Sequence, residues 1–264
     1  MSNTKYGYIG GVESPQGGSG NSGVFSTSEV QDLVLDDLYG VDKVTRGLLF
    51  EYDAKDGGMS GTSVLDISGN GLHATAYNGL SISTSGTYDY GGAFNFDSAN
   101  DYMQRNYTSG MSTWTTKQTI VHIMRTGDLS GRRNIWDQAY GGLGTMTHET
   151  DDRINYFYGT HSGNSTPYTN LTAPAGSRLN NVVVMHLTRQ SGGKVTWYQN
   201  GSQIAQHNTA YNTANGSQNV RIGIGYTNDY WGGKMYVIKA YTEALTSAEV
   251  AQEYNYYKSR FGLN

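Results

Sequence analysis

The chain has 264 residues, of which 36 are glycine, 22 tyrosine, 3 proline and none cysteine, and its formal net charge is −4. Charged residues make up 15% of the chain, well below the ~25% of a typical globular protein. The lack of cysteine excludes disulfides, thiolate metal sites and a cysteine nucleophile, and the abundance of glycine and tyrosine favours a β protein over a helical bundle.

Neither nucleic acid nor a membrane is an expected partner of this chain. Basic residues nowhere cluster beyond the pair Arg132-Arg133, so an electrostatic footprint for nucleic acid is lacking. No apolar run approaches the roughly 18–20 residues of a membrane span. The chain begins MSNTKYGYIGG, without the apolar centre of a signal peptide. We therefore expect a soluble protein made without a secretion signal.

The first part of the chain predicts an arm followed by a short helix. Residues 1–23 are rich in Gly, Ser and Asn and cannot bury enough apolar surface to offset their ordering entropy. Ser26 and Glu29 then form a capping-box pattern, which predicts a helix start. We expect arm and helix to dock to a larger assembly through the apolar residues Val24, Phe25, Val30, Leu33, Val34 and Leu38.

From Arg46 onward the apolar period changes to two, and Gly/Asn/Ser/Asp clusters separate short runs of β-branched and aromatic residues. These runs predict more than ten strands, at 48–52, 93–96, 118–125, 133–137, 144–150, 153–158, 182–189, 194–199, 202–206, 220–224 and 234–241. No βαβ rhythm is present. The pattern predicts an all-β, two-sheet antiparallel sandwich over residues 46–264, after an N-terminal arm and short helix at 1–45.

Two local signals refine this prediction. Asn200-Gly201 supplies the two residues with positive φ that a type I′ hairpin turn requires. A second capping box, Thr246 to Glu249, predicts a C-terminal helix with Val250, Tyr254 and Tyr257 on one stripe. We expect this helix to lie against the sandwich and cover an edge.

Four motifs occur in the order seen in concanavalin A-like (laminin G-like) lectin/glucanase domains, which the chain resembles from about Gly47 to Asn264. They are Asp66–Gly71, Gly92–Asp97 followed by Asn100–Tyr102, Trp197–Gly201, and Tyr241–Glu249. Within that family, Asn134–His148 and the ending Lys258–Gly262 are similar to copies in tailed bacteriophages, notably those of cyanobacteria. Ser22–Ser26 also resembles the leader of phage virion proteins.

This resemblance implies a concanavalin A-like jelly-roll sandwich displayed by a non-enzymatic virion structural protein, such as a capsid decoration, fibre, tail or baseplate component, with residues 1–45 for virion attachment. Its partners would be other virion proteins, bound through the N-terminal arm and helix, and further copies of itself in a homo-oligomer. The protein would be made in the host cytoplasm and exposed on the mature particle. A host-recognition adhesin that binds a surface glycan is the alternative, because a shared fold does not fix function.

A glycoside hydrolase is the third alternative. Glu51, Asp53 and Asp56 resemble the E-x-D-x-x-E strand of glucanases with this fold, whose carboxylates act as nucleophile and general acid. The final acid is shorter by a methylene and Gly57-Gly58 follows at once, so we expect no enzyme. The six histidines show no metal-ligand spacing, and His186 lies in an apolar run typical of a hydrogen-bonded core histidine.

The resemblance also implies one Ca²⁺ site, held by Asp66, Ser68 and Asn70. The family's second carboxylate aligns on Tyr236, which weakens such a site. The alternative interpretation is an Asn-Gly turn in which Asp66 caps nearby backbone N–H groups. Calcium is therefore the one candidate cofactor, and the capped turn is the favoured interpretation of this loop.

A sugar site requires an exposed aromatic platform beside polar groups. Two turn-rich segments have this composition and give the candidate glycan-binding residues Tyr226, Asn228, Asp229, Tyr230, Trp231, Trp136 and Tyr140. With 22 tyrosines in the chain, burial in the core or in subunit contacts is the competing interpretation.

Overall fold

A computed structural model describes residues 41–109, 111, 117–138, 144–157, 172–208, 218–225 and 228–263. The chain divides into two compact units, Met1–Asp42 and Lys43–Asn264, and the second is described below. The predicted arm, the predicted helix after Ser26 and all six predicted docking residues lie outside the described residues. The docking role of residues 1–45 therefore stays a prediction.

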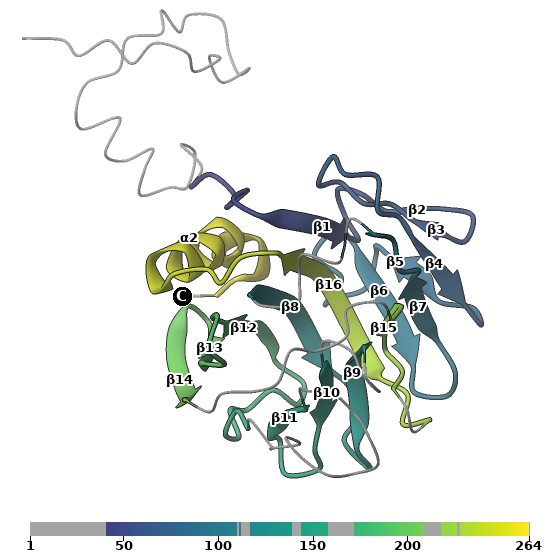
Figure 1. The fold of residues 1–264 in the computed structure, drawn as a ribbon. Coiled ribbons are helices and arrows are strands. Elements are labelled where there is room, and N and C mark those ends of the chain that lie inside the picture. The colour runs from purple at the N-terminus through teal and green to yellow at the C-terminus, as the bar shows by residue number, and fades with distance from the viewer. Residues whose placement is uncertain are drawn as a thin grey trace, which may run out of the picture. The chain divides into compact units, whose positions relative to one another are not determined.

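The described part of the chain forms a two-sheet sandwich whose strand ladders are all antiparallel, as predicted (Figure 1). Sheet A has eight strands in the order β14-β13-β12-β8-β16-β6-β5, and β1 pairs with β16 off this path. Its bounds are β1 Leu48–Asp53, β5 Ser81–Ser83, β6 Ala93–Asp97, β8 Gln118–Thr126, β12 Val182–Arg189, β13 Val195–Gln199, β14 Ser202–His207 and β16 Gly232–Tyr241.

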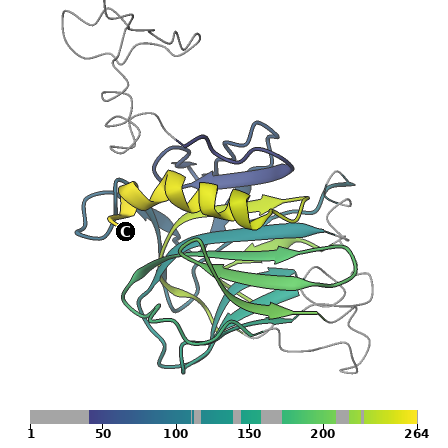
Figure 2. The same cartoon turned by 90° about the vertical axis from the view of Figure 1, so that its left-hand side faces the viewer.

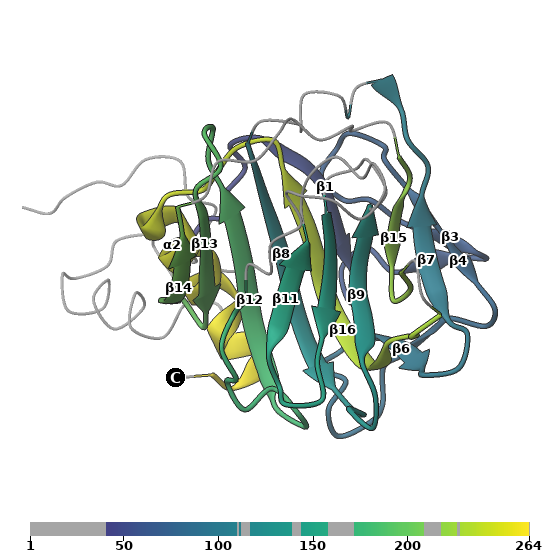
Figure 3. The ribbon, with the colours of Figure 1, turned by 60° about the horizontal axis from the view of Figure 1, so that its bottom comes forward.

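Sheet B also has eight strands, in the order β11-β10-β9-β15-β7-β4-β3-β2. Figure 3 shows several of its strands lying over those of sheet A. The bounds are β2 Met59–Ser60, β3 Ser63–Val64, β4 Ala74–Tyr77, β7 Tyr102–Arg105, β9 Arg133–Gln138, β10 Gly144–His148, β11 Ile154–Phe157 and β15 Val220–Ile222.

The apolar side chains form two separate clusters. The larger cluster lies between the sheets and includes Phe50, Trp136 and Trp231. The second lies on the outer face of sheet A, where Val250 and Tyr257 of helix α2 (Ser247–Lys258) pack against strand residues. Helix α2 therefore forms a third layer that lies alongside sheet A (Figure 2).

The capping box predicted for this helix is present, because the Thr246 side chain accepts from the Glu249 N–H and the Glu249 side chain accepts from the Thr246 N–H. A 3₁₀ turn, η2 (Ser259–Phe261), extends the helix and buries Phe261. The predicted hairpin turn is also confirmed, with φ of 50° at Asn200 and 76° at Gly201. In the described part of the chain, no helix has the length and apolar character needed to cross a membrane.

Candidate functional site

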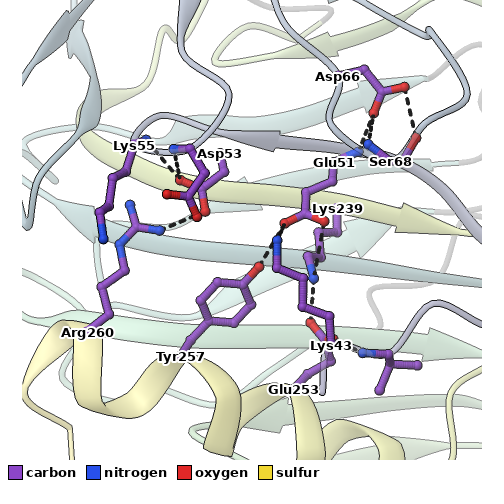
Figure 4. Close-up of polar contacts among 12 residues, drawn as sticks. Lys43, Glu51, Asp53, Lys55, Asp66, Ser68, Lys239, Glu253, Tyr257 and Arg260 are labelled. Carbon is purple, nitrogen blue, oxygen red and sulfur yellow. Dashed lines mark hydrogen bonds and ion pairs between the residues drawn. The ribbon is translucent and has the colours of Figure 1, made fainter. Parts of the chain in front are cut away.

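The carboxylates of β1 are enclosed between sheet A and α2 (Figure 4). The Glu51 side chain is 2% exposed; its Oε1 lies 2.8 Å from Lys43 Nζ and accepts a 3.0 Å hydrogen bond from the Tyr257 hydroxyl. Its second oxygen lies 3.7 Å from Lys239 Nζ. Glu51 is therefore held by three partners and does not face solvent.

Asp53 is pinned in a similar way. Its Oδ1 accepts the backbone N–H groups of Lys55 and Asp56 at 2.9 and 3.3 Å, and its Oδ2 lies 2.7 Å from Arg260 Nη1. Asp53 is fully buried, whereas Asp56 is exposed beyond the strand end. These acids serve the attachment of α2 and η2, and a polysaccharide cannot reach Glu51 or Asp53.

Lys239 and Glu253 complete this buried network. The two side chains are 0% exposed and their charged atoms lie 2.9 Å apart. The other Glu253 oxygen accepts the backbone N–H of Val44 at 2.6 Å. Lys43 and Lys239 thus balance Glu51 and Glu253, which satisfies the requirement that buried charges be paired.

Residues 43–46 fasten the start of the compact unit to α2, and we call them the entry clasp. Besides the contacts of Lys43 and Val44, Arg46 Nε and Nη2 donate to the two Glu249 oxygens at 2.7 and 2.8 Å. The hydrogen bond from Arg46, with those from Thr246, lowers the Glu249 pKa to about 2. The clasp therefore holds the chain against α2 directly after residue 42.

The Asp66 loop forms a capped turn. Asp66 Oδ1 accepts the backbone N–H of Glu51 and of Ser68, both at 2.9 Å, and Oδ2 accepts the Ser68 hydroxyl and the Leu72 N–H. Asn70 Nδ2 donates to two β1 carbonyls. Within the described residues no group of three or more His, Asp or Glu side chains is arranged to hold a metal ion. These contacts match the capping interpretation of Asp66.

The prediction of an exposed platform on Trp136 and Trp231 is wrong, because both side chains are completely buried. Trp136 stacks on Phe50 between the sheets, with ring centroids 6.1 Å apart. Trp231 stacks on His148 at 5.9 Å. The strand period places Trp136 of β9 on the core face, and Trp231, directly before β16, is also a core residue; their large apolar area stabilises the sandwich.

The other candidate sugar residues separate into two groups. Asn228 is exposed, and Asp229 uses its backbone carbonyl to accept the Asn134 N–H at 2.8 Å. Tyr230 is half-buried and lies within electrostatic reach of Tyr102 on β7. Tyr226 and Tyr140 lie outside the described residues. Of Asn228, Asp229 and Tyr230, only Tyr230 is thus near another half-buried aromatic residue, Tyr102.

Thr126, His148 and Asp152 stand in the order hydroxyl, imidazole, carboxylate, with contacts of 3.1 and 2.8 Å. Thr126 and His148 are completely buried, so no substrate reaches the hydroxyl. Asp152 also accepts the backbone N–H of Gly176 and of Arg178 at 3.0 Å. These contacts connect residues 176–178 to strands β8 and β10.

His186 is buried as predicted, but neither ring nitrogen has a hydrogen-bond partner. The prediction that His186 is buried is therefore confirmed, and the prediction that it is hydrogen-bonded is wrong. Burial, with a smaller contribution from Lys239, lowers the His186 pKa to about 3. Burial lowers the His122 pKa to about 3 as well. Both rings are neutral at physiological pH.

The outer face of sheet B carries a row of polar side chains that crosses six neighbouring strands, from β10 to β3. Directly opposed residues follow one another as Thr145, Asp137, Arg221, Gln104, Thr75 and Ser63. Opposed residues share a face, and their chain neighbours Trp136, Ile222, Met103 and Ala76 are core residues. The row therefore points away from the core.

A pocket of about 280 Å³ opens on this row, lined by Gln104, Asp137, Gln218, Asn219 and Arg221. Asp137 is the more buried of the two charged residues in the pocket lining. Its side chain is 2% exposed and pairs with that of Arg221, which is 34% exposed. Asp137 Oδ1 also accepts the Thr145 hydroxyl at 2.8 Å. Asp137 is therefore held by Thr145 and Arg221, and Arg221 is exposed to the pocket.

Two tyrosines flank this pocket. Tyr77 and Tyr102, opposed on β4 and β7, stack with ring centroids 4.6 Å apart and planes inclined by 7°. Burial raises the Tyr102 pKa, as do Tyr77 and Tyr230, whereas Arg221 lowers it. Tyr102 and the pocket residue Gln104 are two residues apart on β7 and share the outer face, so the aromatic pair, which we call the tyrosine ledge, lies next to the pocket lining.

Of the pocket residues, Asp137 lies between the predicted sugar residues Trp136 and Tyr140, whereas the other four were not predicted. The available signal is the polar alternation in Tyr102–Arg105 and Val220–Ile222, where Gln104 follows the buried Met103 and Arg221 sits between two buried apolar residues. That alternation identifies an outward face. It does not reveal that β7, β15 and β9 are neighbours, which the pocket requires.

The fold and this surface define an all-β jelly-roll sandwich. Helix α2 covers the outer face of sheet A, and the described residues place no helix over the outer face of sheet B, which we call the open face. The botulinum neurotoxin serotype D binding domain is similar in structure, with a TM-score of 0.63 and 13% identity over 80% of this chain and 52% of that chain. The type G receptor binding domain gives 0.57 and 16% over 79% and 51%.

A third similar structure is the binding domain of botulinum neurotoxin DC in complex with rat synaptotagmin II, with a TM-score of 0.63 and 11% identity. It covers 80% of this chain, and this chain spans about half of the solved chains it matches. At such identities the likeness shows the fold alone. No protein-family model and no curated protein sequence matches the chain.

Proposed function

We propose that this chain is a non-enzymatic structural protein of a bacteriophage virion that displays its sandwich on the particle surface. The observation that carries the proposal is the entry clasp, which anchors the chain to α2 immediately after the separate unit Met1–Asp42. Because the clasp fixes the point at which the chain leaves the sandwich, the preceding residues can bind a partner while the sandwich stays folded. The sequence resemblance to phage virion domains supports the same role.

The environment of β1 supports the non-enzymatic part of the proposal. Glu51 and Asp53, the pair that resembles a glucanase strand, are buried under α2 and neutralised by Lys43, Lys239 and Arg260. A retaining glycosidase needs both carboxylates beside the substrate. Glu51→Gln is expected to leave any detected glycan hydrolysis unchanged, and loss of hydrolysis would return this strand to consideration.

Deletion of Met1–Asp42 tests the docking role. The truncated chain keeps the whole clasp, so we expect a soluble protein with cooperative unfolding that is no longer incorporated into particles. The undeleted chain, expressed at the same level, is the control. Particles that still carry the truncated protein would contradict the proposal.

The second candidate function is a host-recognition adhesin, favoured by the open polar face of sheet B with its pocket and tyrosine ledge. The similar structures include receptor binding domains, which supports recognition without specifying a ligand. Binding of the purified chain to host surface polysaccharide tests this alternative. On either proposal, several copies displayed on one particle would raise binding strength through multivalency.

A further inference from the structure

We propose that the pocket on the outer face of sheet B binds a neutral, hydroxyl-rich ring, namely a pyranose residue of an uncharged polysaccharide. The inference rests on the adhesin alternative and is independent of virion docking. At about 280 Å³ the pocket lies near the lower end of small-molecule sites, roughly 300 Å³, which suits one sugar ring.

The charge of the pocket favours a neutral ligand. Among the described residues that line the pocket, Arg221 is the only cation. It is paired with Asp137, so the pair adds no net charge. An anionic group would gain from Arg221 and be repelled by Asp137. A hydroxyl group can accept from one partner and donate to the other, and vicinal hydroxyls do both.

The amides of the pocket match hydroxyl groups in the same way. Gln104, Gln218 and Asn219 each carry a carbonyl acceptor and an NH₂ donor. Gln104 Nε2 donates to Asn106 Oδ1 at 2.8 Å, and Asn219 Oδ1 accepts the Tyr107 N–H at 2.8 Å. These contacts orient the two amides before a ligand arrives, which lowers the entropy cost of binding.

The tyrosine ledge supplies the apolar surface that a pyranose requires. A sugar ring presents a C–H face that packs on aromatic rings, while its edge carries the hydroxyl groups. Tyr77 and Tyr102 are half-buried and lie on the same outer face as Gln104, two residues after Tyr102. A ring in the pocket and the next ring on the ledge would thus lie side by side on this outer face.

Affinity electrophoresis of the full chain in gels containing dextran, galactomannan or mixed-linkage β-glucan tests this inference, with polygalacturonate as the acidic counterpart. We expect retardation by at least one neutral polymer and less by polygalacturonate. The double variant Gln104→Ala/Gln218→Ala is expected to bind about tenfold more weakly, as two lost hydrogen bonds predict.

The matched control is Gln203→Ala/Gln206→Ala, which removes two exposed glutamines from edge strand β14 of sheet A. It is expected to bind like the unmodified chain, and both variants should share its melting temperature. No retardation by any neutral polymer, preference for polygalacturonate, or equal effects of the two double variants would overturn the inference. Deletion of Met1–Asp42 should leave binding intact, so failure here is distinguishable from failure of the docking role.

Discussion

The outer faces of the two sheets differ in what covers them. On sheet A, helix α2 buries Glu51, Lys239 and Glu253 in a charge-balanced network. On sheet B, the described residues place no helix over the polar row, and Arg221 remains one-third exposed beside its buried partner Asp137. The same residue types thus hold a layer in place on one face and remain available to a ligand on the other.

This comparison teaches how to interpret acidic strands in such a fold. A pair of carboxylates on one strand face resembles a hydrolase site in sequence, yet Glu51 and Asp53 face a helix that follows almost two hundred residues later. The covering element, not the strand, decides whether an acid is structural or functional. Substitutions on the helix-covered face should therefore lower the free energy of unfolding more than substitutions on the open face.

The largest effect is expected from Glu253→Ala. The change leaves Lys239 buried with only the more distant Glu51 and removes the acceptor of the Val44 N–H. Breaking a buried pair by removing one partner costs about 3–5 kcal/mol. Urea unfolding would measure the loss, with Gln104→Ala on the open face as a control that changes stability by less than about 0.5 kcal/mol. Equal effects would abolish the distinction between the faces.

Acid is expected to destabilise the protein through its buried histidines. Burial lowers the pKa of His122 and His186 to about 3, whereas the unfolded chain takes up these protons near pH 6.5. The unfolded state therefore binds more protons, and stability that is complete above about pH 6.5 falls as pH decreases toward 3. Each histidine contributes about 1.4 kcal/mol per pH unit within that window.

Urea midpoints between pH 7 and pH 4 would measure this slope, with His122→Gln/His186→Gln as the variant that lacks both titrations. Carboxylates titrate alike in the two proteins, so the difference between the slopes isolates the histidines. The variant should show the flatter profile. Parallel profiles would mean that neither ring resists protonation in the folded state.

Asp66→Ala is expected to cost about 2 kcal/mol, because the N–H groups of Glu51, Ser68 and Leu72 lose their acceptor. Chelation by EDTA should leave the melting temperature of the unmodified chain unchanged, since the Asp66 oxygens already accept four hydrogen bonds. Thermal unfolding with EDTA and with added Ca²⁺ measures both effects. A chelator-dependent drop would favour the calcium interpretation.

The smallest effect is expected from Arg46→Ala in the entry clasp. Arg46 is about half exposed and solvent screens its pair with Glu249, so the loss should be at most about 1 kcal/mol. Val44 and Lys43 would still hold the clasp. Thermal unfolding measures this change, and a loss as large as that of Glu253→Ala would show that the clasp, not the buried network, fastens α2.

Much of the fold was predictable because its strands are locally consistent. The predicted strand at 182–189 has the observed bounds, and the capping box at Thr246 and the turn at Asn200 are confirmed. Strands β2, β3 and β5 were missed because each has only two or three residues, too few to show alternation. β4 and β7 were also missed, since Ala and Gln dilute their β signal.

The site was less predictable for a physical reason. A tryptophan beside Asn and Asp has the composition of a sugar platform, but the strand period turns Trp136 into the core, and Trp231 is buried directly before β16. Gln104, Asp137 and Arg221 come from three strands that are distant in sequence and adjacent only in the sheet. Composition indicates an aromatic, amide-rich surface, whereas its position depends on strand order.

Hydrogen exchange of the chain, free and incorporated in purified particles, tests the docking proposal most directly. We expect residues 1–42 to gain protection on the particle, while β4, β7 and β15 on the open face exchange as in the free protein. Protection of the open face with unchanged exchange in residues 1–42 would contradict the proposal, because sheet B would then be the attachment surface.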